Sequence, residues 1–225
     1  MNSIIEVVVL VEGQTEKIFV EELLCPYTAE KNVYLRPIIF TKPGEKGGDI
    51  RFSRAERDIR NHLKQRSETY ITLMMDYYAL KEWPGLTESK HQKEYFKKAE
   101  VINIETQKKV QKLFPEQNRE RRFIPYVSMH ETEALYFSDP EIIADVLNIN
   151  KAEIELILRK CGGGPEAIND NVETAPSKRL SKLSCNKYRK ITSGIAIAKR
   201  IGIQRMREHC PLFNVWVGKI ENLGS

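Results

Sequence analysis

IIEVVVLVEGQTE, residues 4–16, joins a run of β-branched residues to the start of a helical pattern. Isoleucine and valine crowd a helix but pack well on a pleated sheet, so the run before Glu12 predicts a buried strand. After Gly13 the apolar residues return at helical spacing, which predicts a helix. Glu12 therefore ends a strand, and Glu16 lies in the first turn of a helix. Ligands of open α/β sheets gather beyond the carboxyl ends of the strands, so these acids are placed either to hold a cation or to move a proton.

Two later apolar runs also lead into acids. Residues 70–75 predict a strand that ends in Asp76, and residues 123–129 predict one that is followed by Glu131 and Glu133. A carboxylate after a single strand is often only a helix cap or a turn former. Several such carboxylates after parallel strands share one edge of the sheet, which weakens that structural interpretation. We therefore expect five acids at one edge: Glu12, Glu16, Asp76, Glu131 and Glu133.

Strands and helices alternate through the first half of the chain. A strand is predicted at residues 33–40, and a long charged helix is predicted at about residues 89–113. This alternation favours an α/β fold with a mainly parallel sheet flanked by helices. From residue 134 onward the pattern is helical throughout. We expect an α/β core over residues 1–133 and an all-helical C-terminal part, residues 134–225, packed on it.

The composition is that of a soluble globular protein. The 225 residues are 41% hydrophobic and 30% charged, with a net charge of +5. On charge alone, a solvated basic surface is favoured over a nucleic-acid interface. No stretch approaches the roughly 18–20 apolar residues of a membrane helix, and no signal peptide is evident. Four widely separated cysteines without metal-ligand spacing fit reduced thiols, so we expect a cytoplasmic protein without structural zinc.

The acids predict a particular class of metal. Hard oxygen ligands without a cysteine or histidine cluster select Mg²⁺ or Mn²⁺ over zinc. The expected ligands are Glu12, Glu16 and Asp76, with one or both of Glu131 and Glu133. A carboxylate-bound Mg²⁺ keeps several waters and bridges to substrate phosphates, which fits hydrolysis of a phosphodiester bond.

Basic residues are the candidates for phosphate contacts. Lys178 and Arg179 begin a predicted helix, where cations oppose the helix dipole, and an anionic ligand would resolve that placement. Either side chain can stabilise a pentavalent transition state, and we assign Lys178 to that role. Lys46 is a further phosphate candidate in the glycine-rich loop 41–49, where a flexible connector is the favoured alternative. His130 predicts either a general base or a hydrogen-bonded structural histidine.

VEGQTE at a strand–helix junction, with a later strand ending in an acid, resembles the Toprim fold of topoisomerases, primases and overcoming-lysogenization-defect (OLD) nucleases. VEGQTE, MMDYYAL, RFIPYVSMHETEALYFSDP, INDNVETAPSKR and REHCPLF together resemble one Toprim-like family closely, domain of unknown function 4276. The resemblance covers the chain almost end to end. It implies a catalytic glutamate at Glu12, metal ligation by Asp76 and an OLD-like additional acid at Glu16. It also implies pairing with an ABC- or AAA-type ATPase in bacterial anti-phage systems.

The sequence departs from the Toprim pattern at one position. Toprim proteins typically carry Asp-x-Asp here, whereas this chain has Asp76-Tyr77-Tyr78. Either Glu131 or Glu133 supplies the missing oxygens, or one metal is held, or the protein is inactive.

Three functions are therefore open. The favoured one is a Mg²⁺-dependent nuclease that acts on DNA or RNA with the ATPase partner. The second is a non-catalytic module that binds the ATPase or a nucleic acid. The third is a phosphoryl-transfer enzyme with Asp76 as nucleophile, ranked last because its DxDx(T/V) and receiver-type lysine patterns are absent. The oligomeric state is open, and a homo-oligomer is compatible with the sequence.

Overall fold

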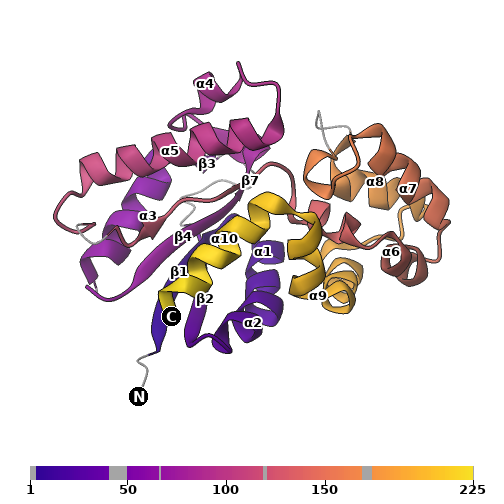
Figure 1. Cartoon of the computed structure of the whole chain (residues 1–225), viewed down its shortest axis with the longest axis horizontal. Helices are drawn as coiled ribbons and strands as arrows, with labels where there is room; N and C mark the ends of the chain where they lie inside the picture. The colour runs from indigo at the N-terminus through magenta and orange to yellow at the C-terminus, as the bar shows by residue number, and fades with distance from the viewer. Residues whose placement is uncertain (1–3, 41–49, 66, 119–120, 169–173, 225) are drawn as a thin grey trace.

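A parallel sheet lies between two layers of helices in the computed structural model, which describes residues 4–40, 50–65, 67–118, 121–168 and 174–224 (Figure 1). The strand order is β2-β1-β4-β6, and β7 pairs with the end of β4. The strands are β1 (Ile5–Val11), β2 (Val33–Ile39), β4 (Tyr70–Asp76), β6 (Phe123–Ile124) and β7 (Val127–Ser128). A second, two-stranded sheet pairs β3 (Ile50–Arg51) with β5 (Leu80–Lys81). The predicted α/β fold with a mainly parallel sheet is confirmed.

β1 is a central strand because its residues suit burial on both faces. It pairs in parallel with β2 on one side and with β4 on the other. Side chains alternate along a strand, so Val7, Val9 and Val11 enter one core. Val8 and Leu10 enter the other core, on the opposite face of the sheet. A strand that is buried on both faces has a continuous apolar sequence, as this one does.

Each face of the sheet has its own helices (Figure 1). One face is covered by α3 (Phe52–Gln65) and α5 (Tyr95–Leu113). The other face is covered by α1 (Gln14–Phe19), the π-helix η1 (Val20–Leu24), α2 (Cys25–Ala29) and α10 (Pro211–Glu221). Three-residue and four-residue helices, η2 (Tyr77–Ala79) and α4 (Leu86–Ser89), follow β4.

Two predicted elements differ from the structure. The helix predicted at about residues 89–113 begins only at Tyr95, because residues 91–94 are polar and give a helical turn nothing to bury. The continuous strand predicted at residues 123–129 is wrong. Pro125 separates β6 from β7, since proline has no N–H to donate to the ladder.

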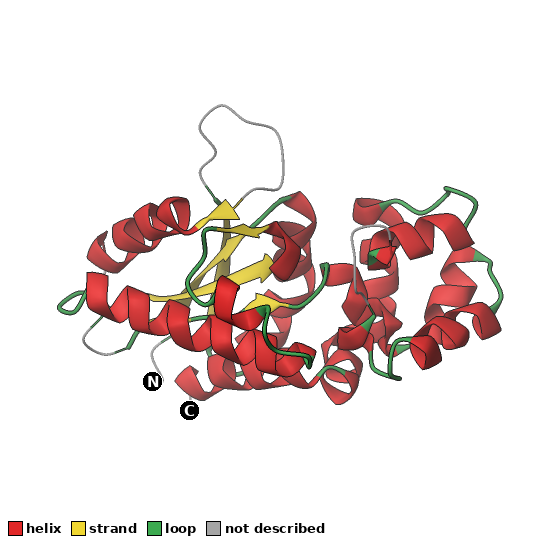
Figure 2. Cartoon of the chain, turned by 90° about the horizontal axis from the view of Figure 1, so that it is seen from above, coloured by secondary structure: helices red, strands yellow, loops and turns green. Residues whose placement is uncertain are grey.

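The C-terminal part is helical, as predicted. Its elements are η3 (Thr132–Ser138), α6 (Pro140–Leu147), α7 (Lys151–Lys160), η4 (Pro165–Ala167), α8 (Pro176–Leu183), the π-helix η6 (Lys190–Gly194), α9 (Ile195–His209), α10 and η7 (Asn222–Gly224). Helices α6, α7 and α8 form a group beside the sheet (Figure 2). None of the described helices is long and apolar enough to cross a membrane.

α10 packs the C-terminal part on the sheet. The indole Nε1 of Trp216 donates to the Thr72 hydroxyl at 2.8 Å, and that hydroxyl donates to the Ile124 carbonyl at 2.7 Å. The Trp216 ring also stacks on Tyr126, with 4.4 Å between the ring centroids. Residues of α9 and α10 therefore share one core with β1. The division between residues 133 and 134 stays a prediction.

Candidate functional site

The carboxyl ends of β1 and β4 bring acids to one edge of the sheet. Asp76 is the last residue of β4 and lies opposite Ser128 of β7. Glu12 directly follows β1, the parallel neighbour of β4. Glu16 is a buried residue in the first turn of α1, and its Oε1 accepts a hydrogen bond from the Thr132 hydroxyl at 3.3 Å.

Four further acids lie close enough to Asp76 to raise its pKa. Burial is the main cause that raises this pKa well above its ordinary value, and the negative charges of Glu16, Glu12, Glu131 and Glu133 raise it further. A nearby like charge disfavours the ionised form of a carboxyl group. The five acids therefore gather at one edge of the sheet, where the strand pattern predicts them.

Glu131 is held through both of its carboxylate oxygens. Its Oε1 lies 2.9 Å from Lys190 Nζ, and its Oε2 accepts a hydrogen bond of 2.9 Å from the Ser177 backbone N–H. Burial alone would raise the pKa of Glu131, but Lys190 and Ser177 outweigh it and lower this pKa below its ordinary value. Ser177 is in the first turn of α8, so Glu131 supplies an anion to that helix N-terminus.

Glu133 is fully buried next to the same ammonium group. Its Oε1 accepts a hydrogen bond from the Tyr188 hydroxyl at 3.2 Å and lies 3.3 Å from Lys190 Nζ. Its Oε2 has no hydrogen-bond partner among the described residues. Burial raises the pKa of Glu133 to about 7; Lys190 opposes the rise and Glu131 adds to it. This carboxyl group is therefore poised to exchange a proton near neutral pH.

Lys190 joins the two glutamates from the start of η6. Burial would lower its pKa, but the charges of Glu133 and Glu131 have the larger effect and raise it above the ordinary value. The ammonium group is therefore permanently charged at neutral pH. Sequence reasoning missed Lys190 and Tyr188, because a contact between segments more than 50 residues apart leaves no spacing signal in the chain.

A family model described as "Domain of unknown function (DUF4276)" matches residues 11–221. The chain belongs to the DUF4276 family. No curated protein and no solved structure matches it. The match confirms the family expected from the sequence motifs, whereas the relation to Toprim domains stays a prediction.

The basic residues predicted to bind phosphate lie differently in this DUF4276 protein. Lys190, which the sequence pattern did not predict, contacts two of the acids, and the predicted Lys178 is exposed on α8. Arg179 Nε donates to the Thr174 carbonyl at 2.7 Å, and its guanidinium contacts Cys161 Sγ at 3.8 Å. Arg179 thus holds the segment that leads into α8. Lys46 lies outside the described residues.

His130 and Tyr78 lie together beside Asp76. The two rings stack with 6.2 Å between their centroids, and the Ser128 hydroxyl donates to the His130 carbonyl at 2.6 Å. The His130 side chain is buried. Burial and ring stacking do not decide between the two predicted roles of His130, and both stay predictions. Tyr78 is partly exposed and lies two residues after Asp76.

The chemistry of the acids fits a hard divalent cation. All donors are carboxylate oxygens, and the single ammonium group of Lys190 faces two of the five carboxylates. Yet no three acidic, histidine or cysteine side chains of the described residues converge closely enough to enclose a metal ion. Glu131 already has both oxygens engaged, which disfavours the predicted ligand role for it. Glu12, Glu16, Asp76 and Oε2 of Glu133 stay candidate ligands.

Proposed function

We propose that this DUF4276 protein is a Toprim-like nuclease that hydrolyses phosphodiester bonds of nucleic acid with Mg²⁺ or Mn²⁺. The observation that carries the proposal is the placement of Glu12, Glu16 and Asp76 at the carboxyl edge of a parallel sheet, where burial and four neighbouring carboxylates raise the pKa of Asp76. Such a concentration of acid is costly for a fold, because burial penalises each charge and the charges repel one another. A bound cation would offset both costs.

The residues have separate roles in this proposal. Glu12, Glu16 and Asp76 would hold the cation, with Oε2 of Glu133 as a further ligand. A bound Mg²⁺ would activate a water and stabilise charge on the phosphate oxygens. Lys190 keeps Glu131 and Glu133 in place and lowers the negative charge that an approaching phosphate meets.

We further propose that the nuclease is the cytoplasmic effector of a bacterial anti-phage system and acts with an ABC- or AAA-type ATPase. The resemblance of the sequence motifs to the Toprim-like family supports this part of the proposal. Either DNA or RNA fits the chemistry, because both present the same phosphodiester group.

Cation binding and cleavage test the proposal together. Isothermal titration with Mn²⁺ and cleavage of DNA and RNA oligonucleotides should both give a positive result with the purified protein, alone or with its ATPase. Glu12→Gln and Asp76→Asn should each abolish cleavage and weaken Mn²⁺ binding. Glu30→Gln, at the exposed position directly after α2, should change neither. Cleavage by either site variant at the wild-type rate would refute the assignment.

A non-catalytic binding module is the second candidate. Tyr78 in place of an acid and the fully engaged oxygens of Glu131 favour it, since both reduce the number of metal ligands. Lack of Mn²⁺ binding at millimolar concentration would support the module and reject the nuclease. The third candidate, phosphoryl transfer to Asp76, is weakened because a raised pKa makes this carboxyl group a poorer nucleophile at neutral pH.

A further inference from the structure

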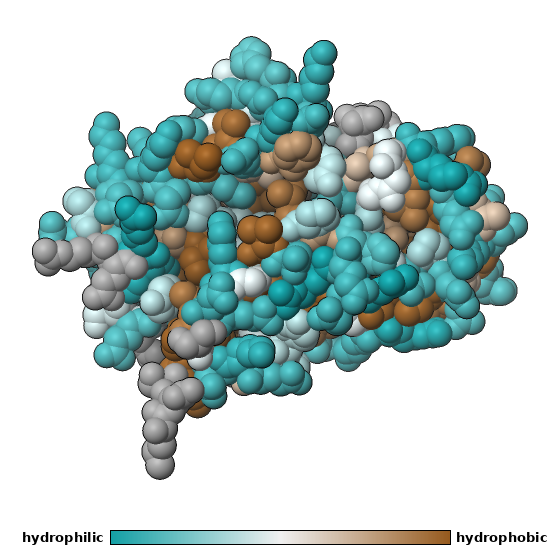
Figure 3. All heavy atoms as spheres, in the orientation of Figure 1, coloured by the Kyte–Doolittle hydropathy of each residue, from teal (hydrophilic) through white to brown (hydrophobic). Residues whose placement is uncertain are grey.

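A groove follows the open edge of the sheet between α5 and α10. β6 is the last strand in the sheet order, and the two helices cover opposite faces beside it (Figure 1). Two adjoining cavities of about 900 and 420 Å³ make up the groove, and both are lined by Pro125 and Lys219. Figure 3 shows apolar surface exposed in the strip between these helices.

The wall formed by α5 carries two exposed apolar residues that the core does not use. The stripe that packs on the sheet consists of Ala99, Ile102, Thr106 and Val110. Phe96 and Ile104 line the groove instead, and both are exposed. Val215 of α10 is exposed on the facing wall. Exposed apolar side chains on both walls of one groove mark an interaction surface rather than scattered surface residues.

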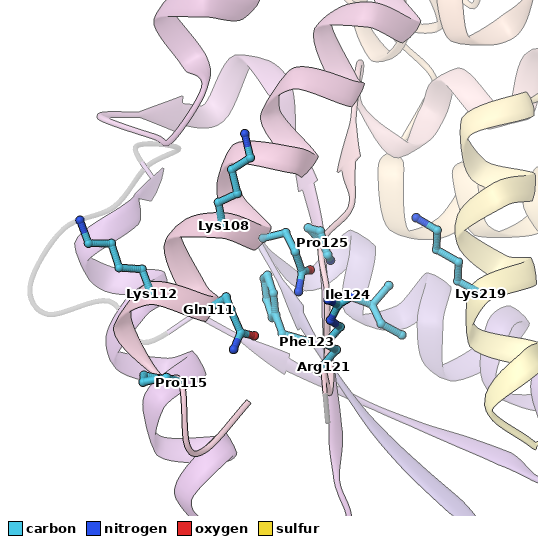
Figure 4. Close-up of a pocket in the computed structure, with 10 residues that line it drawn as sticks. Lys108, Gln111, Lys112, Pro115, Arg121, Phe123, Ile124, Pro125 and Lys219 are labelled. Atoms are coloured by element: carbon cyan, nitrogen blue, oxygen red, sulfur yellow. The ribbon is translucent and has the colours of Figure 1, made fainter. Parts of the chain in front are cut away.

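The larger cavity is basic. It is lined by Lys108 and Lys112 from α5, Arg121 from the segment before β6, and Lys219 from α10 (Figure 4). Lys108 pairs with Glu105, whereas no described carboxylate forms an ion pair with Lys112, Arg121 or Lys219. Glu100, in the smaller cavity, is the one acid among the residues that line the two cavities.

We propose that this groove binds an acidic amphipathic helix of a partner protein. Residues 96–112 of α5 span about 24 Å at 1.5 Å per residue, the length of a helix of roughly four turns. The apolar face of such a helix would cover Phe96, Ile104 and Val215, and its carboxylates would meet the basic end. The inference is independent of the proposed nuclease, because the groove shares no residue with the acidic site.

Two other occupants fit the groove less well. A second copy of this chain carries a net charge of +5 and would bring positive charge to a basic groove. A nucleic acid would satisfy the lysines and could stack a base on Phe96, but it would gain little from Ile104 and Val215. The combination of exposed apolar side chains on both walls and a basic end therefore favours an acidic amphipathic helix.

Fluorescence anisotropy with a designed peptide tests the proposal on the full chain. The probe is a fluorescein-labelled peptide of about 18 residues with leucine on one helical face and glutamate elsewhere. A peptide of the same composition in scrambled order and one with lysine in place of glutamate are the controls. We expect only the acidic amphipathic peptide to bind, and added salt to weaken its binding.

Paired variants locate the binding site. Ile104→Asp should weaken peptide binding about tenfold or more. Leu156→Asp on α7 is its matched control, because these side chains are 44% and 43% exposed. Lys112→Glu should also weaken binding, whereas Lys160→Glu, at an exposed position of α7, should not. Circular dichroism and thermal unfolding of each variant show that it is folded.

Three results would overturn the proposal. One is equal binding of the scrambled peptide or of the Ile104→Asp variant. Another is binding of single-stranded DNA, and not of the peptide, by the wild type, with loss of this DNA binding in Ile104→Asp and Lys112→Glu. The third is a dimer, detected by analytical ultracentrifugation, that Ile104→Asp dissociates and Leu156→Asp does not.

Discussion

Lys190 Nζ lies 2.9 Å from Glu131 Oε1, although 59 residues separate them in the chain. The same nitrogen lies 3.3 Å from Glu133 Oε1. One ammonium group at the start of η6 therefore contacts both Glu133 of η3 and Glu131, the residue directly before η3. This bridge sets the charge of the acidic edge and leads to the first prediction.

Lys190→Met should destabilise the protein more at high pH than at low pH. At pH 8 Glu133 is ionised in the wild type, because its pKa is about 7 with Lys190 beside it, so the substitution removes an ion pair and raises this pKa further. We expect a loss of roughly 1–2 kcal/mol in the free energy of unfolding, because solvent screens an ammonium group that is 43% exposed. At pH 5 Glu133 is protonated and the loss should be smaller. Urea unfolding at the two pH values measures the difference.

The control for this prediction is Lys199→Met. Lys199 is 54% exposed and pairs with Glu22 at the surface, so its loss should cost little at either pH. An equal cost of Lys190→Met at pH 5 and pH 8 would show that the bridge carries no pH-dependent stability.

Gly194→Ala should displace Tyr188 from Glu133. A Cβ at position 194 would lie 2.6 Å from the Tyr188 hydroxyl oxygen, which is closer than a carbon atom can approach. We expect a loss of about 1–3 kcal/mol in stability from this overpacking, measured by urea unfolding. Tyr188→Phe in the same chain removes the clashing oxygen and should recover part of the loss.

Gly218→Ala is the matched control, because nothing lies within 4 Å of a Cβ at that position of α10. It should be neutral or stabilising, since alanine favours a helix over glycine. If Tyr188→Phe and Gly194→Ala destabilise additively, the proposed clash is absent.

Thr72→Val should weaken the attachment of α10 to the sheet. The Thr72 hydroxyl accepts from Trp216 Nε1 and donates to the Ile124 carbonyl, and valine removes both buried hydrogen bonds. We expect a loss of about 1–3 kcal/mol in the free energy of unfolding. Thr87→Val, at an exposed position of α4, should leave stability unchanged. Equal stability of the two variants would argue against this anchor.

Glu166→Gln should remove a pH dependence of stability. Glu166 accepts backbone hydrogen bonds from Leu212 and Phe213 at the start of α10, yet burial outweighs these bonds and raises its pKa from 4.5 to about 7. Because the folded pKa exceeds the unfolded one, Glu166 contributes stability that is complete below pH 4.5 and is lost as the pH rises through 7.

The expected loss is about 3 kcal/mol, on the order of 1.4 kcal/mol for each unit of pKa. Urea unfolding at pH 4.5 and pH 8 measures it as the change with pH of the stability difference between wild type and Glu166→Gln. The exposed Glu30→Gln variant should show no such change. A difference that is constant with pH would mean that Glu166 ionises normally.

Tyr78→Asp should strengthen Mn²⁺ binding. Tyr78 lies two residues after Asp76 and is partly exposed, so an aspartate there adds an oxygen ligand at the acidic edge without removing core packing. We expect about tenfold tighter binding in isothermal titration, because affinity for hard cations grows with the number of charged ligands. Tyr78→Phe should bind Mn²⁺ as the wild type does. Unchanged affinity of Tyr78→Asp would place the cation away from this residue.

Much of the fold and part of the site follow from local sequence. β-branched residues before Glu12 and an apolar run before Asp76 predict two strands, because strand preference arises from each side chain and its immediate neighbours. Parallel pairing then brings both acids to one edge. Pro125 is also visible in the sequence, but whether it ends a strand or only bends it depends on which β4 residues are opposite.

The sequence by itself determined which acids reach the carboxyl edge of the sheet and that helices follow them. Only the tertiary structure decided which of them remain for a cation, because Glu131 meets Ser177 and Lys190 through the packing of η3 against α8 and η6. Strand ends are set by neighbouring residues along the chain. Charge pairing between distant segments is set by how those segments pack, and no local pattern in the sequence encodes it.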